Sequence, residues 1–486
     1  MAKNLYKSEG KAEKTTPAAS RWSDEIAAAK KRQTQFWKDG KHCIKQYKLE
    51  QANQNSIWRD KYNILYSSTE TTRPSLYAKT PKVEATQRHK DRNNLKASAA
   101  TLVIESACQF ALEELDFDDI MNNVVIDYLL PGIGNAWVRY EPTFRTEGEG
   151  ENAEEVLDFE GLAVDYVSWD DQLYGDAKVW ADMPWIGRRV FFTKKKAKKR
   201  FGEDKANKLA YTHKRSEDGA PGVSDQAVIY EIWDKENRTV LWYCDDYPGG
   251  VIEEIDDPLN LNQFYPCPRP VRAVSTTECF MPQSLYSQYR QQAEELNDIT
   301  QRIRILTKAL RVVGIYDSSS GALEKMLTGN DNRMIPVENW AQFAGTGGLN
   351  GAVQFMPIKD IAAVLTELYK QREIAKAEIY EITGFSDIVR GVSKASETLG
   401  AQEIKNQWAG GRLKSFQKDI QRFARDIIRI MSEIMCEQFD DETLALYAGF
   451  EPPEITPQEQ QAQQQYMAQT LAASQMPGTP MPPPRS

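Results

Sequence analysis

The sequence has 486 residues, of which 41% are hydrophobic and 27% charged, and its formal net charge is −9. This length allows roughly two to four domains with a sizeable core. The acidic balance argues against a surface that acts over its whole extent as a nucleic-acid clamp, but it is compatible with a conduit through which DNA slides. No apolar run approaches about eighteen residues, so we expect no membrane span. The six cysteines include no C-x-x-C pair, which favours reduced thiols in a cytosolic setting.

The first part of the chain has mainly helical patterns. Residues 1–20 are polar, and we expect them to be disordered. Ser23, which acidic residues follow, predicts the N-cap of a helix that runs to about Tyr47. Two further helices are expected, from about His89 to Leu115 and from Phe117 to Leu130.

Strand patterns follow, after a break at Pro131–Gly134. The last two predicted strands are joined by Asp234–Arg238 and form a plausible hairpin. The predicted strands are Ala136–Tyr140, Ala163–Val167, Val228–Trp233 and Thr239–Tyr243. Between them, the basic stretch Lys194–Arg200 follows Thr193. We interpret it as a short solvated helix with a threonine cap, and a nucleic-acid patch is the alternative.

Between Ser284 and Met435 lie three long helical patterns, each with an apolar seam at steps of three and four residues. The first contains Leu285, Tyr289, Ala293, Leu296, Ile299, Ile303, Leu306, Leu310 and Val313. The second contains Ile358, Ile361, Leu365, Leu368, Ala375, Ile379 and Ile382, and the third Leu413, Phe416, Ile420, Phe423, Ile427, Ile430 and Ile434. At about 1.5 Å per residue the first is expected to be roughly 40 Å long. We expect these seams to be too long and too exposed for one subunit to bury, which predicts an oligomer.

The segments that connect these helices are distinct in composition. Gly314–Pro357 is rich in Gly and Asn and predicts a compact α+β insert at the tip of a helical hairpin. Thr383–Ser396 is a predicted loop, and Gly410–Gly411 predicts a kink in the third helix. From Pro452 the chain is rich in Gln and Pro and is expected to be mobile.

No pattern in the sequence predicts catalysis. Each of the three histidines (His42, His89 and His213) is in a polar context without a nucleophile motif, and no Cys/His spacing suits zinc. Asp170–Asp171 fits a turn or a strand-end cap better than a metal site. Gly132–Gly134 and Gly345–Gly351 fit turns better than nucleotide-binding loops. We therefore expect no enzyme activity, no cofactor and no metal.

Six segments, in this order along the chain, resemble tailed-bacteriophage portal proteins, in particular those of short-tailed phages. They are NILYSSTETTRPSLY at 63–77, DYLLPGIGNAWVRYE at 127–141, YVSWDDQLY at 166–174, WIGRRVFFT at 185–193, EITGFSDIVRG at 381–391 and SETLGAQ at 396–402. No single segment has a strict consensus, so the specificity of the resemblance comes from the six in order.

This resemblance implies a predominantly helical α+β subunit of a ring, usually of twelve copies, through whose axis DNA enters and leaves the capsid. The implied parts are a wing at 21–282, with its β-rich portion at about 135–270, a helical-hairpin stem at 283–313 and 358–382, and a small α+β clip at 314–357. A tunnel loop at 383–396, a kinked wing helix at 397–426, a short helical crown at 427–451 and the tail at 452–486 complete the chain.

The resemblance also implies partners and candidate residues. The partners are double-stranded DNA bound without sequence preference, the terminase motor, the major capsid and scaffolding proteins and a tail adaptor, within a virion assembled in the host cytoplasm. In the tunnel loop, Gly384 and Gly391 are candidate hinges, and Arg390 and Lys394 are candidate phosphate contacts. Alternatively, Arg390 pairs with Asp387 or Glu397 and only holds the loop together.

The face of the first stem helix opposite its seam carries mixed charges that suit a channel wall or pairs between subunits. These residues are Arg290, Glu294, Asp298, Arg302 and Lys308. Two other classes of protein stay open: a DNA-processing or motor subunit, which needs an ATP site, and an oligomeric scaffold that passes no DNA.

Overall fold

The computed structural model describes residues 17–49, 61–87, 94–147, 154–213, 225–309, 314–316, 353–355, 358–384 and 399–449. Within them the fold is mixed α+β, with more residues in helices than in strands. None of the helices in these ranges is long and apolar enough to cross a membrane. The long helices are α1 (Pro17–Tyr47), α2 (Ile64–Leu76), α3 (Leu95–Glu114), α4 (Phe117–Leu129), α7 (Arg290–Ala309), α11 (Ile358–Thr383) and α12 (Leu399–Gln438).

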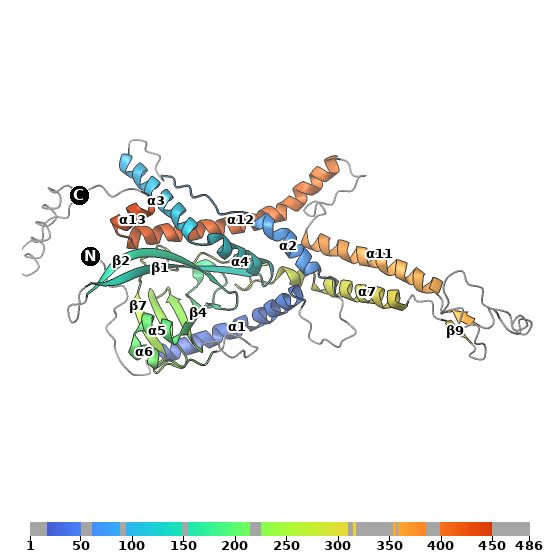
Figure 1. Ribbon diagram of the computed structural model, residues 1–486, viewed down its shortest axis with the longest axis horizontal. Coiled ribbons are helices and arrows are strands. Elements are labelled where there is room, and N and C mark those ends of the chain that lie inside the picture. Colours follow the sequence, from blue (N-terminus) through green and yellow to red (C-terminus); the bar gives the residue numbers. More distant parts are fainter. Residues whose placement is uncertain are drawn as a thin grey trace, which may run out of the picture.

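The molecule is elongated, with most elements gathered in a body from which two helices project (Figure 1). The projecting helices are α7 and α11, which we call the arm, and the short strands β9 (Gly314–Tyr316) and β10 (Val353–Phe355) lie beyond its far end (Figure 1). These two strands pair antiparallel. The rest of the predicted clip, most of the tunnel loop, the first 16 residues and the tail from residue 450 lie outside the described residues.

Two antiparallel sheets form the β part of the body. Five strands pair in the order β3-β4-β5-β6-β7, and β1 lies between β2 and β8 in the second sheet. The strands are β1 (Ile133–Glu147), β2 (Glu154–Val167), β3 (Gln172–Tyr174), β4 (Trp185–Thr193), β5 (Gln226–Asp234), β6 (Thr239–Tyr243), β7 (Val251–Asp256) and β8 (Val271–Arg272). The predicted hairpin through Asp234–Arg238 is thereby confirmed as β5 and β6.

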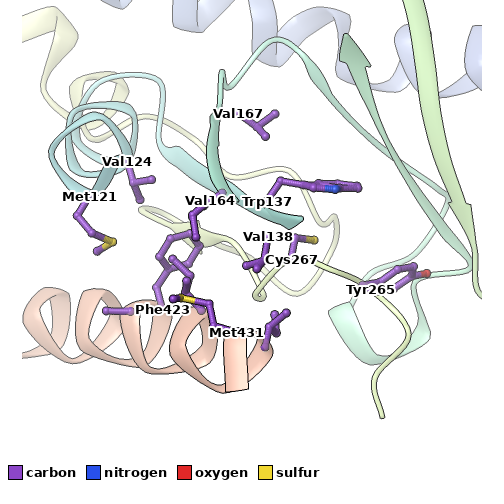
Figure 2. Packing of buried hydrophobic residues seen from close by; sticks show 14 of the residues in the cluster. Met121, Val124, Trp137, Val138, Val164, Val167, Tyr265, Cys267, Phe423 and Met431 are labelled. Atoms are coloured by element: carbon purple, nitrogen blue, oxygen red, sulfur yellow. The ribbon is translucent and has the colours of Figure 1, made fainter. Parts of the chain in front are cut away.

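The main core lies between the sheet of β1 and β2 and the helices that cover it. In Figure 2, Met121 and Val124 of α4 and Phe423 and Met431 of α12 point toward the side chains of the strands. All four are buried, as is Trp137 of β1. The C-terminal part of α12 therefore belongs to the body, and the short helix α13 (Asp441–Tyr447) follows it. Figure 1 shows that α12 bends, so that its N-terminal part leaves the body.

The expectation that one subunit cannot bury the three seams is wrong for the described residues. In α7, Leu296, Ile299 and Ile303 are buried against residues of the same chain, and in α12 so are Phe423 and Ile427. The physical reason is that the seams of α7 and α11 cover each other, while the body covers the seam of α12. The periodicity located the buried stripes but did not identify what buries them.

Some element boundaries also differ from the prediction. The first helix begins at Pro17, so Ser23 lies inside it and is not its N-cap. Residues 64–76 form α2, which Asn63 caps by accepting a hydrogen bond from the Tyr66 backbone N–H at 3.0 Å. The first stem helix is interrupted, because a short 3₁₀ turn at Leu285–Gln288 precedes α7. The predicted helix at 117–130 is confirmed as α4.

Candidate functional site

The arm is held together by one apolar interface between its two helices. Tyr289, Ala293, Leu296, Ile299 and Ile303 on the α7 side form one buried cluster with Leu368, Ala375 and Ile379 of α11. Leu296 and Ile379 have no exposed surface. At the base of the arm the cluster continues into the body through Cys43, Ile64, Leu65 and Leu130. The arm is therefore a continuation of a packed core.

The residues just before α2 fix both helices of the arm to the body. The backbone N–H of Tyr62 donates a hydrogen bond to Asn297 Oδ1 of α7 at 2.8 Å. The Lys376 ammonium of α11 lies 4.8 Å from the centroid of the Tyr62 ring, within the range of a cation–π contact. One short segment of the body thus contacts both helices of the arm.

Large apolar side chains remain exposed on the arm although its seam is buried. We call these four residues the flank residues: Ile305, Val364, Tyr369 and Ile374, which are 45%, 51%, 41% and 58% exposed. Tyr369 follows the buried Leu368, and Ile374 precedes the buried Ala375. Successive helical residues are about 100° apart, so Tyr369 and Ile374 lie on opposite sides of the buried stripe. The arm presents apolar surface on both sides.

The predicted charged face of α7 is exposed, and the structure brings part of it together. Arg290 Nε donates to Glu294 Oε1 at 2.9 Å, one helical turn away, so this pair is internal to the helix. Glu294, Asp298 and Arg302 line one open recess of about 390 Å³, which Glu295 and Gln371 also border. Lys308 is exposed near the end of α7, outside that recess.

Only one of the four predicted tunnel-loop residues is described. Gly384 ends α11 with a φ of +71°, and its backbone N–H donates to the Tyr380 carbonyl at 2.9 Å. This is a left-handed helix end, at which glycine has no steric cost. Arg390, Gly391 and Lys394 lie outside the described residues.

A residue that the sequence reasoning missed lies beside this glycine. Arg412 of α12 donates from a guanidinium NH to the Ile382 carbonyl at 2.7 Å. A Cβ at Gly384 would come within 2.9 Å of Arg412 Cδ. Both Arg412 and Thr383 line a cavity of about 500 Å³ between the arm and the body, with Ser68, Thr72 and Phe416 among its other walls. No periodic signal marks Arg412, because it is exposed and off the seam.

The acidic pair Asp170–Asp171 and the thiol of Cys43 are in structural settings. Arg189 Nε donates to Asp171 Oδ1 at 2.6 Å, and Ser168 donates to Asp170, so the acidic pair is part of a hydrogen-bonded turn. Burial raises the pKa of the Cys43 thiol to about 12, which disfavours its nucleophilic form.

His42 and His213, the two described histidines, are also in structural settings. Burial and the nearby Arg290 guanidinium lower the pKa of His42. His213 stacks on Phe191 with ring centroids 4.8 Å apart. His89 lies outside the described residues. Among the described residues no cluster of three or more His, Cys, Asp or Glu side chains could hold a metal ion.

The arm is thus the most distinctive surface in the described part of the chain. It combines a rigid base, apolar flanks and a charged face, a combination suited to contact with other macromolecules. In comparisons with known proteins, no family model and no curated protein matches the chain.

Proposed function

We propose that this chain is the subunit of a phage portal, a ring-shaped DNA channel at one vertex of the capsid. In this role the ring docks the terminase motor during genome packaging and the tail adaptor afterwards, and DNA leaves through it. The subunit serves as conduit and docking platform, without catalysis. Major capsid and scaffolding proteins are its other expected partners, and the assembled virion is its expected location.

The observation that carries the proposal is the projecting arm with exposed apolar residues on two sides. In a closed cyclic ring every subunit contacts its left and right neighbours through different surfaces. Tyr369 and Ile374 lie on opposite sides of α11, as such head-to-tail contacts require. Burying a large exposed apolar side chain against a matching surface of a neighbouring copy is favourable, because it removes apolar area from water.

The buried seam of the arm changes the physical account of the ring. Neighbouring copies are not needed to cover the seam of α7, because α11 already does so. In this proposal neighbouring subunits contact one another through the flank residues of arms that are already folded. Assembly then joins folded subunits, which is the rigid docking expected of interfaces that change little on binding.

The recess on the charged face of α7 fits a channel wall better than a tight DNA clamp. Glu294, Glu295 and Asp298 outnumber Arg302 around the recess, so the local field does not attract phosphates strongly. DNA that must slide through a pore benefits from weak contacts, since each strong phosphate contact adds to the affinity. In this proposal Arg390 and Lys394 supply the few transient attractive contacts.

The mass of the purified full-length chain tests this proposal. The subunit has a mass of 55.3 kDa, and mass photometry over a range of concentrations is expected to show a discrete species of many subunits. The measurement should be repeated with the capsid and scaffolding proteins present. A well-folded monomer under all of these conditions would contradict the proposal.

A further inference from the structure

The helix α5 (Lys194–Phe201) concentrates positive charge in a chain of net charge −9. It follows β4 directly and is capped by Thr193, whose Oγ1 accepts from the Lys196 backbone N–H at 3.4 Å. The predicted threonine-capped helix is thereby confirmed. Every residue of this helix except Ala197 and Phe201 is Lys or Arg.

A packed apolar base holds α5 in place. Ala197 and Phe201 are buried in a cluster with Ile229, Trp242 and Ile252 of the five-stranded sheet. The guanidinium of Arg200 lies 5.1 Å from the Trp242 ring centroid and donates to Glu253 Oε2 at 2.8 Å. The orientation of the helix is therefore fixed, and its remaining basic side chains lie on a rigid surface.

Two acidic residues close to α5 already pair with cations of α5 or of the following helix. Glu203 pairs with Lys198, and Glu253, which is 7% exposed, lies between Arg200 and Lys205. Lys195, Lys196 and Lys199 are exposed, and no carboxylate of the described residues is within ion-pair distance of them. A helix with several adjacent uncompensated charges repels itself, so a polyanion that neutralises them stabilises it.

The location of α5 separates it from the arm. Figure 1 shows α5 and the adjoining α6 (Glu203–Asn207) at the lower edge of the body, while the arm projects from the opposite end. One polyanion contact at α5 is therefore distinct from any contact that the arm makes.

We propose that α5 is a second nucleic-acid surface, which binds the phosphate backbone of double-stranded DNA without reading its sequence. A peptide partner would need apolar anchors, but the apolar residues of α5 are buried in the body. Single-stranded nucleic acid would need exposed aromatic rings for stacking, and the only aromatic residue of α5, Phe201, is 7% exposed. Lysines on one helical surface suit phosphate contacts, which position a duplex but carry no sequence information.

The proposal is tested with the full-length chain and a labelled DNA duplex, by fluorescence anisotropy between about 50 and 200 mM salt. The test variant is Lys195→Gln, Lys196→Gln and Lys199→Gln combined, since glutamine keeps helix propensity. The control replaces three exposed lysines elsewhere with the same change in net charge: Lys79→Gln, Lys96→Gln and Lys178→Gln.

The expected result is specific to α5. Each lost phosphate contact reduces the magnitude of the slope of log K against log salt by about 0.9, so the three substitutions should reduce it by about 2 to 3 and weaken DNA binding at the lower salt by at least about tenfold. The control should bind as the wild type does.

The proposal is overturned if both triple variants lose affinity equally, if the test variant binds as the wild type does, or if polyglutamate displaces the duplex at equal charge concentration. Because the readout is DNA affinity and not subunit mass, failure here is distinguishable from failure to form a ring.

Discussion

Tyr369 and Ile374 lie on opposite sides of the stripe through which α11 packs on α7. Each is adjacent in sequence to a buried residue of that stripe, Leu368 or Ala375, and is displaced from it by about 100° in opposite senses. The guanidinium of Arg372 lies 5.0 Å from the Tyr369 ring centroid, so that ring already has one polar contact within its own helix. Neither flank residue is needed to hold the arm together.

The double variant Tyr369→Ser with Ile374→Ser should form smaller assemblies, since both sides of each arm lose apolar contact area. Its monomer should keep the wild-type stability to within about 0.5 kcal/mol, because both side chains are exposed. Mass photometry and urea denaturation measure the two effects. Leu102→Ser with Leu446→Ser, at sites 56% and 62% exposed on α3 and α13, is the matched control.

The seam of the arm should behave as ordinary core. Leu296→Ala is expected to lower the free energy of unfolding by about 2 to 5 kcal/mol, because it leaves a cavity between α7 and α11. Ile305→Ala, on the same helix at a site 45% exposed, should change it by about 0.5 kcal/mol or less. Equal effects in urea denaturation would show that the seam is not buried within one chain.

A buried carboxyl beside the core should make stability depend on pH. Burial raises the pKa of Asp127 to about 7, although the Tyr166 hydroxyl at 2.6 Å and the Trp169 backbone N–H at 3.2 Å donate hydrogen bonds to its Oδ2. The folded protein therefore keeps this proton to a higher pH than the unfolded chain does. Its contribution to stability falls as pH rises from about 4 to about 7.

Asp127→Asn removes this dependence and keeps an oxygen that accepts both hydrogen bonds. The free energy of unfolding of the variant minus that of the wild type should therefore be roughly 2 to 3 kcal/mol larger at pH 8 than at pH 5. Urea denaturation at the two pH values measures the gain. The same difference at both would show that Asp127 is ionised in the folded protein throughout this range.

Arg188, Glu231 and Asp165 form an ion cluster that links the two sheets, and removing only its arginine should lower the free energy of unfolding. Arg188 donates to Glu231 Oε2 at 2.7 Å and to Asp165 Oδ2 at 2.8 Å, and both Arg188 and Glu231 are buried. Arg188→Met should destabilise the protein by about 3 to 5 kcal/mol, because Glu231 is left buried without its cation. Adding Glu231→Gln should recover part of that loss in a double-mutant cycle. Additive effects would contradict coupling between the two side chains.

The tunnel-loop prediction concerns residues outside the described part of the chain. Arg390→Ala with Lys394→Ala should leave assembly intact and reduce packaging or retention of DNA, since one or two phosphate contacts per subunit are lost. Particle DNA content and subunit mass are measured on the same preparation. Unassembled subunits would show that these residues hold the loop together instead.

The sequence predicted which helical residues are buried better than it predicted which elements bury them. The steps of three and four residues correctly marked Leu296, Ile299 and Ile303 as buried, because periodicity records which face of a helix avoids water. It could not tell that α11 covers them, since burial depends on a surface distant in sequence. The long pairing of β1 with β2, out to Glu147 opposite Glu154, was also missed. Backbone hydrogen bonds extend the pairing of β1 and β2 into residues of low strand propensity, for which the sequence pattern predicts no strand.

The candidate site was predicted only in part. The charged residues of α7 were found because they lie opposite a recognisable seam. Tyr369 and Ile374 were overlooked because they lie next to seam residues in sequence and are off the stripe. Apolar residues that break a helical pattern are the signal that could have found them.

The most direct test of the account is an image of the purified assembly by electron cryomicroscopy. We expect a closed ring with an axial opening, in which α7 and α11 of neighbouring subunits contact one another through their flank residues. An open chain of subunits, a compact oligomer without an opening, or a ring whose arms touch no neighbour would contradict it.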